Sequence, residues 1–251
     1  MTRLHAGPAA ERSRYAAALG GDHMKNFVNA IARFVFGLRG PSKAVNLRLL
    51  RARGESLESL AIREAIREDI PALAALHVRT WKETYWNVRN PPTYGIREQQ
   101  WREQFKLTDG SWFCFVVENR KGELVGFAKG NTYNHSDLPD FSGELNKIYL
   151  LREYQRLGVG RRLVGCVARR FRSQGINTMV LFGTPQNPSC AFHEALGGER
   201  LIAKNGEFHG GYGWRDLHRL ANSCPVEHVP SAPYQDTAPD IAAIPPTRAR
   251  L

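Results

Sequence analysis

The chain has 251 residues, of which 42% are hydrophobic, so it has room for one well-filled domain with extensions. Lys and Arg outnumber Asp and Glu by 35 to 24, which gives a formal net charge of +11. This balance suits nucleic acid, an anionic membrane surface or a cofactor with several phosphates, and charge alone does not choose among them. No apolar run approaches the roughly 20 residues of a membrane-spanning helix, which excludes that class of integral membrane protein.

The four cysteines, Cys114, Cys166, Cys190 and Cys224, show no CxxC spacing and have no clustered histidines nearby. The pattern indicates neither a zinc site nor a disulfide framework, so we expect no metal. The first 20 residues also lack the uninterrupted apolar core of a secretory signal. A reducing, cytoplasmic location is the expectation that follows.

Residues 1–59 are predicted to be a basic N-terminal extension. Ten basic and four acidic side chains lie in residues 1 to 60. Apolar residues from Phe27 to Leu38 recur at helical spacing until Gly40 and Pro41 end the pattern, which predicts a short amphipathic helix. This helix has two interpretations, a membrane or partner surface and a cover for an apolar patch or oligomer interface. We favour the second, because soluble proteins commonly bury one such face.

The next segment alternates short strands and helices. Asp69 and Pro71 are typical of a helix start, and three aromatic residues follow between Trp81 and Trp86. Apolar alternation and a four-residue turn predict an antiparallel hairpin. In order, the pattern predicts a strand at 60–65, a helix after Asp69, a helix at 96–105, and hairpin strands at 112–118 and 123–130.

The segment 144–170 changes from a strand to a helix at a glycine-rich turn. An apolar run ends near Leu151, and Gln155-Arg156-Leu157-Gly158-Val159-Gly160 leads into residues with helical periodicity. The first N–H groups of a helix lack partners and carry the positive end of its dipole, and glycine lets a ligand approach the backbone closely. A phosphate-bearing ligand is therefore the expected guest.

Beyond this helix the sequence predicts a strand at 177–183 and a last hairpin from 199–204 and 211–217. Between them lies the block Asn187-Pro-Ser-Cys-Ala-Phe-His-Glu-Ala-Leu-Gly-Gly198. Residues 221–251 contain six prolines and are predicted to be a disordered tail.

The glycine turn resembles the acetyl-CoA signature Gln/Arg-x-x-Gly-x-Gly/Ala of the GNAT N-acetyltransferase superfamily, through Gln155, Gly158 and Gly160. The strand before it and the block after Asn187 are similar to the same family, and the resemblance covers about residues 60–220. Two departures stand out. His193 occupies the place of the usual tyrosine, and Gly198 the place of the usual aromatic residue.

The resemblance implies an α/β (α+β) fold, with a mixed, mostly antiparallel sheet flanked by helices and splayed at the acetyl-CoA site. It also implies direct transfer of acetyl from acetyl-CoA to a primary amine of a small molecule or a protein, with two helices after residue 69 walling the acceptor pocket. Glu144 is the candidate base, and His193 is the candidate acid for the leaving thiolate or else a packing residue. The matching motifs assign acetyl-CoA to Ile148, Leu150, Gln155, Arg156, Leu157, Gly158, Val159, Gly160, Arg161 and Asn187.

Two other functions remain open at this stage. The missing tyrosine favours a CoA-binding regulatory module without catalysis, and the basic segment 25–53 is compatible with a nucleic-acid or membrane adaptor, the least favoured of the three. The sequence names neither the amine acceptor nor the oligomeric state, and a homodimer is one of the arrangements left open.

Overall fold

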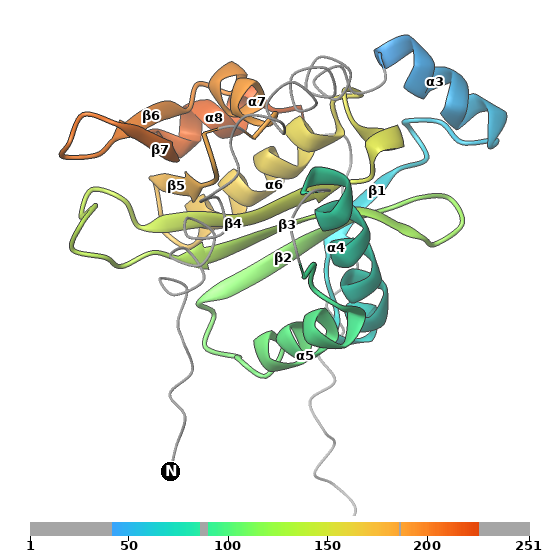
Figure 1. Ribbon diagram of the computed structural model, residues 1–251, viewed down its shortest axis with the longest axis horizontal. Coiled ribbons are helices and arrows are strands. Elements are labelled where there is room, and N and C mark those ends of the chain that lie inside the picture. The colour runs from blue at the N-terminus through green and yellow to red at the C-terminus, as the bar shows by residue number, and fades with distance from the viewer. Residues whose placement is uncertain (1–41, 86–89, 186, 226–251) are drawn as a thin grey trace, which may run out of the picture.

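The computed structural model describes residues 42–85, 90–185 and 187–225. The helix predicted at 27–38 and the tail from residue 226 onward lie outside these residues. Figure 1 shows the arrangement of the described elements, with a central sheet between two layers of helices. In the described part of the chain no helix is long and apolar enough to cross a membrane.

Seven strands form one sheet in the order β1-β2-β3-β4-β5-β7-β6. Every neighbouring pair is antiparallel except β4 and β5, which are parallel. The expected mixed, mostly antiparallel sheet is therefore confirmed. The strands are β1 Ala61–Glu64, β2 Trp112–Glu118, β3 Leu124–Thr132, β4 Gly143–Leu150, β5 Met179–Phe182, β6 Glu199–Ile202 and β7 Phe208–Trp214.

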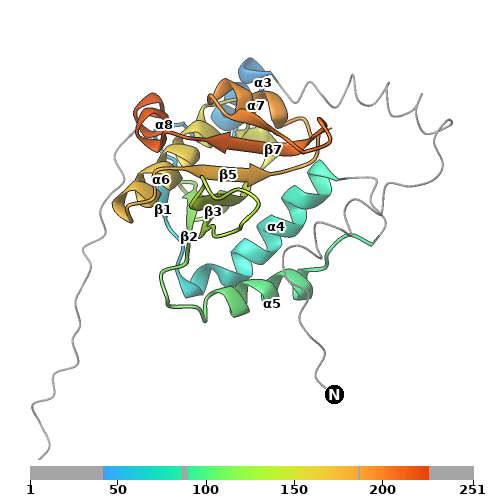
Figure 2. The ribbon, with the colours of Figure 1, turned by 90° about the vertical axis from the view of Figure 1, so that its left-hand side faces the viewer.

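Helices cover both faces of this sheet, as Figures 1 and 2 show. On one face, α4 packs His77 against Phe127 of β3, with ring centroids 5.3 Å apart. On the other face, Phe171 of α6 packs 4.9 Å from Phe113 of β2. The α-helices are α3 Lys43–Ala52, α4 Ile70–Thr84, α5 Tyr94–Gln104, α6 Val159–Ser173, α7 Cys190–Ala195 and α8 Leu217–Ser223. Two 3-10 helices, η1 Arg67–Asp69 and η2 Arg152–Tyr154, connect β1 to α4 and β4 to α6.

Most predicted elements appear within two residues of their predicted bounds, because their apolar periodicity matches the buried faces. Asp69 matches its prediction only in part. It precedes α4, as expected for a residue at a helix start, but its carboxylate does not cap that helix. The carboxylate instead accepts a hydrogen bond from Ile66 N at 2.9 Å and pairs with Arg63 at 2.7 Å. The carboxylate therefore fixes the β1–α4 connection.

Three α-helices were not predicted: α7, which forms within the block after Asn187, and the helices at the two ends of the described domain. Helix α3 lies within the segment 1–59 that the sequence assigned to an extension, and α8 runs past the predicted tail boundary at 221. Both pack on the domain: α3 contacts η2, and α8 contacts α6. The folded unit among the described residues thus begins near Ser42 and ends near Cys224.

Candidate active site

Strands β4 and β5 separate soon after they begin. Their pairing comprises Gly143 with Met179 and Glu144 with Val180, and β4 then continues to Leu150. On the other side, β4 stays paired with β3, where Lys129 lies opposite Lys147 and Gly130 opposite Leu145. Asn146 is the extra residue of this register shift, so it forms a β-bulge. The bulge bends β4 just beyond the point where the two strands part.

The turn between β4 and α6 has a backbone that exposes the helix N-terminus. Arg156 and Gly158 have φ angles of 63° and 88°, and Gly158 is the N-cap of α6. A side chain at Gly158 would meet open space, so its positive φ, not crowding, is the reason for glycine there. The bond from Arg162 N to Gly158 O, 3.1 Å, closes the first helical turn, and the N–H groups before Arg162 have no partner within the helix.

Side chains fasten this turn to its neighbours. Gln155 Nε2 donates to the carbonyl of Leu150 at 2.9 Å, which ties the turn to the end of β4. A Cβ at Gly160 would lie 3.2 Å from Phe192 and 3.5 Å from Leu150, so α6, α7 and β4 meet at this glycine. A large side chain at position 160 would fill that junction.

The three arginines near the turn have different surroundings. Arg161 donates to the carbonyl of Ser223 at 3.4 Å, and Arg162 donates to the carbonyls of Leu57 and Leu60 at 3.5 and 3.3 Å. Their guanidinium groups thus hold neighbouring segments, a role that the sequence did not predict. Arg156 is exposed and makes no polar contact with a described residue, which leaves its charge available at the turn.

Helix α3 braces the segment that leads into the turn. Asn46 is fully buried, and its Nδ2 donates to the carbonyls of Arg152 and Gln155 at 3.1 and 2.8 Å. Just after α3, the buried carboxylate of Glu55 accepts a 2.6 Å hydrogen bond from Tyr154 Oη. Sequence reasoning missed Asn46 because a single polar residue in a short polar helix gives no signal of its burial.

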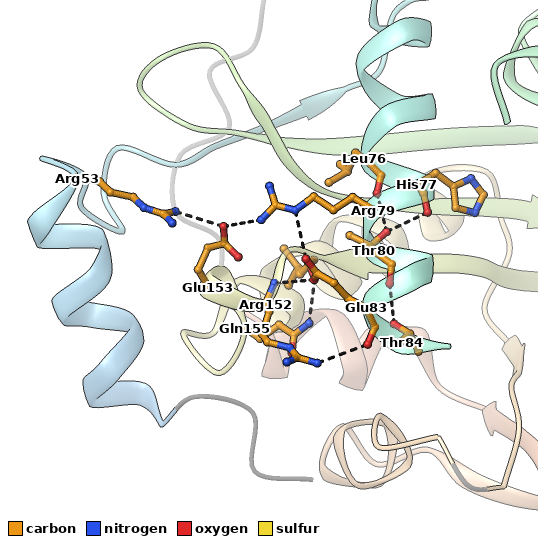
Figure 3. Close-up of polar contacts among 11 residues, drawn as sticks. Arg53, Leu76, His77, Arg79, Thr80, Glu83, Thr84, Arg152, Glu153 and Gln155 are labelled. Atoms are coloured by element: carbon orange, nitrogen blue, oxygen red, sulfur yellow. Dashed lines mark hydrogen bonds and ion pairs between the residues drawn. The ribbon is translucent and has the colours of Figure 1, made fainter. Parts of the chain in front are cut away.

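A chain of ion pairs extends this brace to α4 (Figure 3). Glu153 Oε1 accepts from Arg53 at 3.3 Å and from Arg79 of α4 at 2.9 Å. Arg79 also pairs with Glu83 at 3.2 Å, and Glu83 accepts from Arg152 N at 3.3 Å. Burial alone would raise the pKa of Glu153, but its backbone hydrogen bond and the two arginines hold that pKa below its ordinary value. The segment before the turn is therefore connected electrostatically to both α3 and α4.

Glu144 lies where β4 and β5 part. It is the last residue of β4 that pairs with β5, and it is only 9% exposed. Asn146 Nδ2 donates to Glu144 Oε1 at 3.3 Å, and Lys147 Nζ donates to Asn146 Oδ1 at 2.9 Å. The carboxylate is thus held by the bulge residue at the start of the gap between the strands.

The other residues expected to bind the cofactor surround the same gap. Ile148 and Leu150 are half-buried on β4 beyond the divergence. Asn187 lies in the loop after β5, where its Nδ2 donates to the hydroxyl of Tyr85 at 3.3 Å and its Oδ1 accepts from Ser189 N at 2.9 Å. Asn187 therefore links this loop to the C-terminal end of α4, a contact that the sequence did not predict.

His193 has the surroundings of a packing residue. It is 3% exposed, its Nε2 lies 3.2 Å from Ser189 Oγ, and its ring lies 5.4 Å from Tyr212 and 6.2 Å from Trp214 between ring centroids. Burial lowers its pKa to about 4, because the aromatic surroundings disfavour the charged ring. The imidazole is therefore neutral at pH 7, and of its two interpretations packing is the better supported.

Comparison with known proteins agrees with this geometry. The sequence pattern of the Acetyltransferase (GNAT) family matches residues 73–197. The chain is 34% identical over 172 residues to the uncharacterized N-acetyltransferase YuaI of Bacillus subtilis, covering 64% of this chain and 96% of that protein. It is 26% identical over 159 residues to a phosphinothricin N-acetyltransferase of Streptomyces viridochromogenes, covering 62% of this chain and 83% of that enzyme.

Solved structures share the fold. The PaiA N-acetyltransferase of Thermoplasma acidophilum, solved in complex with coenzyme A, has a TM-score of 0.50 at 19% identity, covering 62% of this chain and 98% of its own. A GNAT-family acetyltransferase of Staphylococcus aureus has a TM-score of 0.51 at 14% identity, and the alignment covers 63% of this chain and 99% of that one. The sheet order, the divergence after Glu144, the glycine turn and an alignment that spans 96% of YuaI lead to one conclusion: this chain belongs to the GNAT acetyltransferase family.

Proposed function

We propose that this protein is an N-acetyltransferase that transfers the acetyl group of acetyl-CoA directly to a primary amine. The observation that carries the proposal is the divergence of β4 from β5 beside the free N-terminus of α6. Beyond Glu144, the first feature leaves the β4 backbone groups on the side of β5 without a partner strand among the described residues, while β3 stays paired on the other side. The second feature offers N–H groups to an anion. Membership of the GNAT family supports the same reaction.

The residues around the gap suit the parts of this cosubstrate. The turn from Gln155 to Arg161 has outward N–H groups and the exposed cation Arg156, which fit a pyrophosphate. The β4 backbone at Ile148 and Leu150 fits an extended amide-containing arm, and Asn187, in the loop after β5, is proposed to hold that arm from the other side. Acetyl-CoA supplies the acetyl group as a thioester.

Glu144 is proposed to deprotonate the acceptor, directly or through water. A lysine-like primary amine has a pKa of about 10.4 and is mostly protonated at neutral pH, so it needs a base before it can attack. The buried position of Glu144 where the strands part supports this role. Backbone N–H groups of β4 would polarise the thioester carbonyl as its C–S bond breaks and the C–N bond forms.

His193 is proposed to pack rather than to donate a proton. Its low pKa and aromatic surroundings support this assignment. A thiol has a pKa of about 8.5, so the thiolate is a fair leaving group without a dedicated acid.

Replacing the proposed base tests this function. We expect Glu144→Gln to lower kcat/KM for the amine roughly 100- to 10,000-fold at pH 7, measured as thiol release, with acetyl-CoA affinity retained. The loss should shrink as the pH approaches the amine's own pKa of about 10.4, because the amine then loses its proton unaided. Glu64→Gln on the edge strand β1, where the carboxylate is half exposed beside Arg170, is the matched control. Activity of Glu144→Gln within threefold of the wild-type value at pH 7 would remove Glu144 from the mechanism.

The alternative is a regulatory module that binds acetyl-CoA without transferring its acetyl group. The absence of the family's usual tyrosine is the feature in its favour. It requires tight acetyl-CoA binding without thiol release for any amine, whereas the transferase releases thiol in proportion to amine consumed.

A further inference from the structure

Three buried side-chain nitrogens on α4 and α5 have no hydrogen-bond partner among the described residues. They are His77 Nδ1, Arg97 Nε and Trp101 Nε1. Their side chains are nearly inaccessible, with exposed fractions of 2% for His77, 4% for Arg97 and 3% for Trp101. Buried polar groups are normally satisfied, so three unsatisfied nitrogens in adjoining helices require an explanation.

The three groups are close together. The rings of His77 and Trp101 lie 6.0 Å apart between centroids, and Arg97 precedes Trp101 by four residues, so both occupy the same side of α5. Arg97 and Trp101 are donors, and His77 Nδ1 is a donor in one tautomer. What is missing from this cluster is therefore an acceptor.

Arg97 is the least expected member of the cluster. Its one hydrogen bond from the guanidinium goes to Gln100 Oε1 at 2.7 Å, and it forms no ion pair with a described residue. Arg102, on the same helix but exposed, pairs with Glu98 at 2.8 Å. A buried charge without a counterion is strongly disfavoured, so the surroundings of Arg97 suit an anion that the chain itself does not provide.

Two lysines of the sheet, Lys129 and Lys147, add positive charge near these three nitrogens. Lys129 of β3 lies directly opposite Lys147 of β4, and its ammonium donates to Gln104 of α5 at 2.5 Å. Burial, and then Arg97, Lys147 and Lys129, lower the pKa of His77 to about 2, so the imidazole between these cations is neutral. Tyr149, two residues from Lys147 on β4, packs 5.3 Å from His77. Helix α5 and strands β3 and β4 thus direct positive charge to one place.

We infer that Arg97 and Trp101, with Lys129 and Lys147 nearby, form a subsite for an anionic group of the acceptor. The acceptor is then an amine that also bears a carboxylate or a similar oxyanion, as an amino acid does. This inference rests on the proposed transferase function. Lys147 also contacts Asn146, which holds Glu144, so the anionic end of such an acceptor lies toward α5 when its amine lies toward the base.

Matched acceptors test the subsite. Thiol release is measured with several L-amino acids, such as methionine, phenylalanine and glutamate, and with the α-amide of each. The amide loses the α-carboxylate charge but has the more easily deprotonated amine, so intrinsic reactivity works against the expected result. We expect the wild-type protein to favour the acid over its amide at least tenfold in kcat/KM.

Substitutions on α5 test whether Arg97 produces the preference for the amino acid over its amide. Arg97→Met should reduce the acid-to-amide ratio about 10- to 100-fold, mainly through KM for the acid, with amide turnover within threefold. Arg97→Lys should keep an acid-to-amide ratio between those of Arg97→Met and the wild type. The exposed control Arg102→Met should leave the wild-type ratio unchanged. Arg97→Met should melt at or above the wild-type temperature, because it removes an unpaired buried charge.

The outcomes separate this inference from the proposed function. Turnover of amides as fast as acids by the wild-type protein, or an unchanged ratio in Arg97→Met, overturns the subsite and leaves the transferase intact. If no amine is turned over, the transferase proposal fails, and calorimetry of acid and amide binding to the CoA-loaded protein decides the subsite. Binding of the acid that weakens at least tenfold in Arg97→Met supports it there, and equal binding of acid and amide overturns it.

Discussion

His77 and His193 are the two histidines that the fold buries almost completely among the described residues. Burial lowers the pKa of His77 to about 2, with nearby cations contributing, and that of His193 to about 4. In the unfolded chain both titrate near 6.5. The unfolded state therefore binds more protons below that pH, so stability must fall as the pH falls.

The pH dependence of unfolding tests both assignments. Between pH 7 and pH 5 each histidine should lower the free energy of unfolding by about 2 kcal/mol, and urea titrations at the two pH values measure the difference. His77→Phe and His193→Phe should each remove about that share, whereas the exposed His218→Phe should not. His193→Phe should also keep turnover within threefold of the wild-type rate. An unchanged pH dependence in both buried variants would contradict the assignment of neutral, buried rings.

Among the elements, α3 is joined by hydrogen bonds to the segment that leads into the glycine turn proposed to bind the cofactor. The side chain of Asn46 satisfies two carbonyls of that segment, and Arg53 and Glu55 add contacts to Glu153 and Tyr154. These residues precede the part of the chain that matches the family pattern, which begins at residue 73. Helix α3 therefore lies outside the matched stretch, and its contacts hold the backbone on which the proposed pyrophosphate contacts depend.

Asn46→Leu, which keeps a side chain branched at Cγ with the same number of heavy atoms, tests these contacts. It leaves the carbonyls of Arg152 and Gln155 without their partner, and the turn should loosen. We expect the Kd for acetyl-CoA to rise about 5- to 30-fold, equivalent to about 1 to 2 kcal/mol, with kcat at saturation within threefold. The exposed Arg48→Ala on the same helix is the control. An unchanged Kd in Asn46→Leu, in a protein that melts like the wild type, would show that α3 does not act on the turn.

Across the whole molecule, the sequence predicted those elements whose formation depends on residues close together in the chain. The apolar run of β2 and the helical periodicity of α6 were located from sequence because their buried faces repeat at fixed spacing. The glycine turn was located because Gly158 needs a positive φ at a strand-to-helix junction. Glu144 was chosen by resemblance to the family, and its burial at the point of divergence fits that choice.

The features that sequence did not predict depend on distant partners. The bulge at Asn146 exists only in the register between β3 and β4. The burial of Asn46 depends on carbonyls 106 and 109 residues away, and that of Arg97 on packing against the neighbouring helix and sheet. Contacts between segments that are far apart in the chain leave no repeating pattern of residues within a single helix or strand.

The gap beside the α6 turn is proposed to bind acetyl-CoA for transfer to an amine. The most direct measurement is free-thiol release from acetyl-CoA, with a panel of amino acids, amino-acid amides, polyamines and peptides, for the wild-type protein and Gly160→Glu. A carboxylate at position 160 would occupy the junction of α6, α7 and β4 and repel phosphate. We predict amine-dependent release by the wild type and its loss in Gly160→Glu with the fold retained by circular dichroism. Tight acetyl-CoA binding by the wild type without release for any amine would contradict the account and indicate the regulatory module.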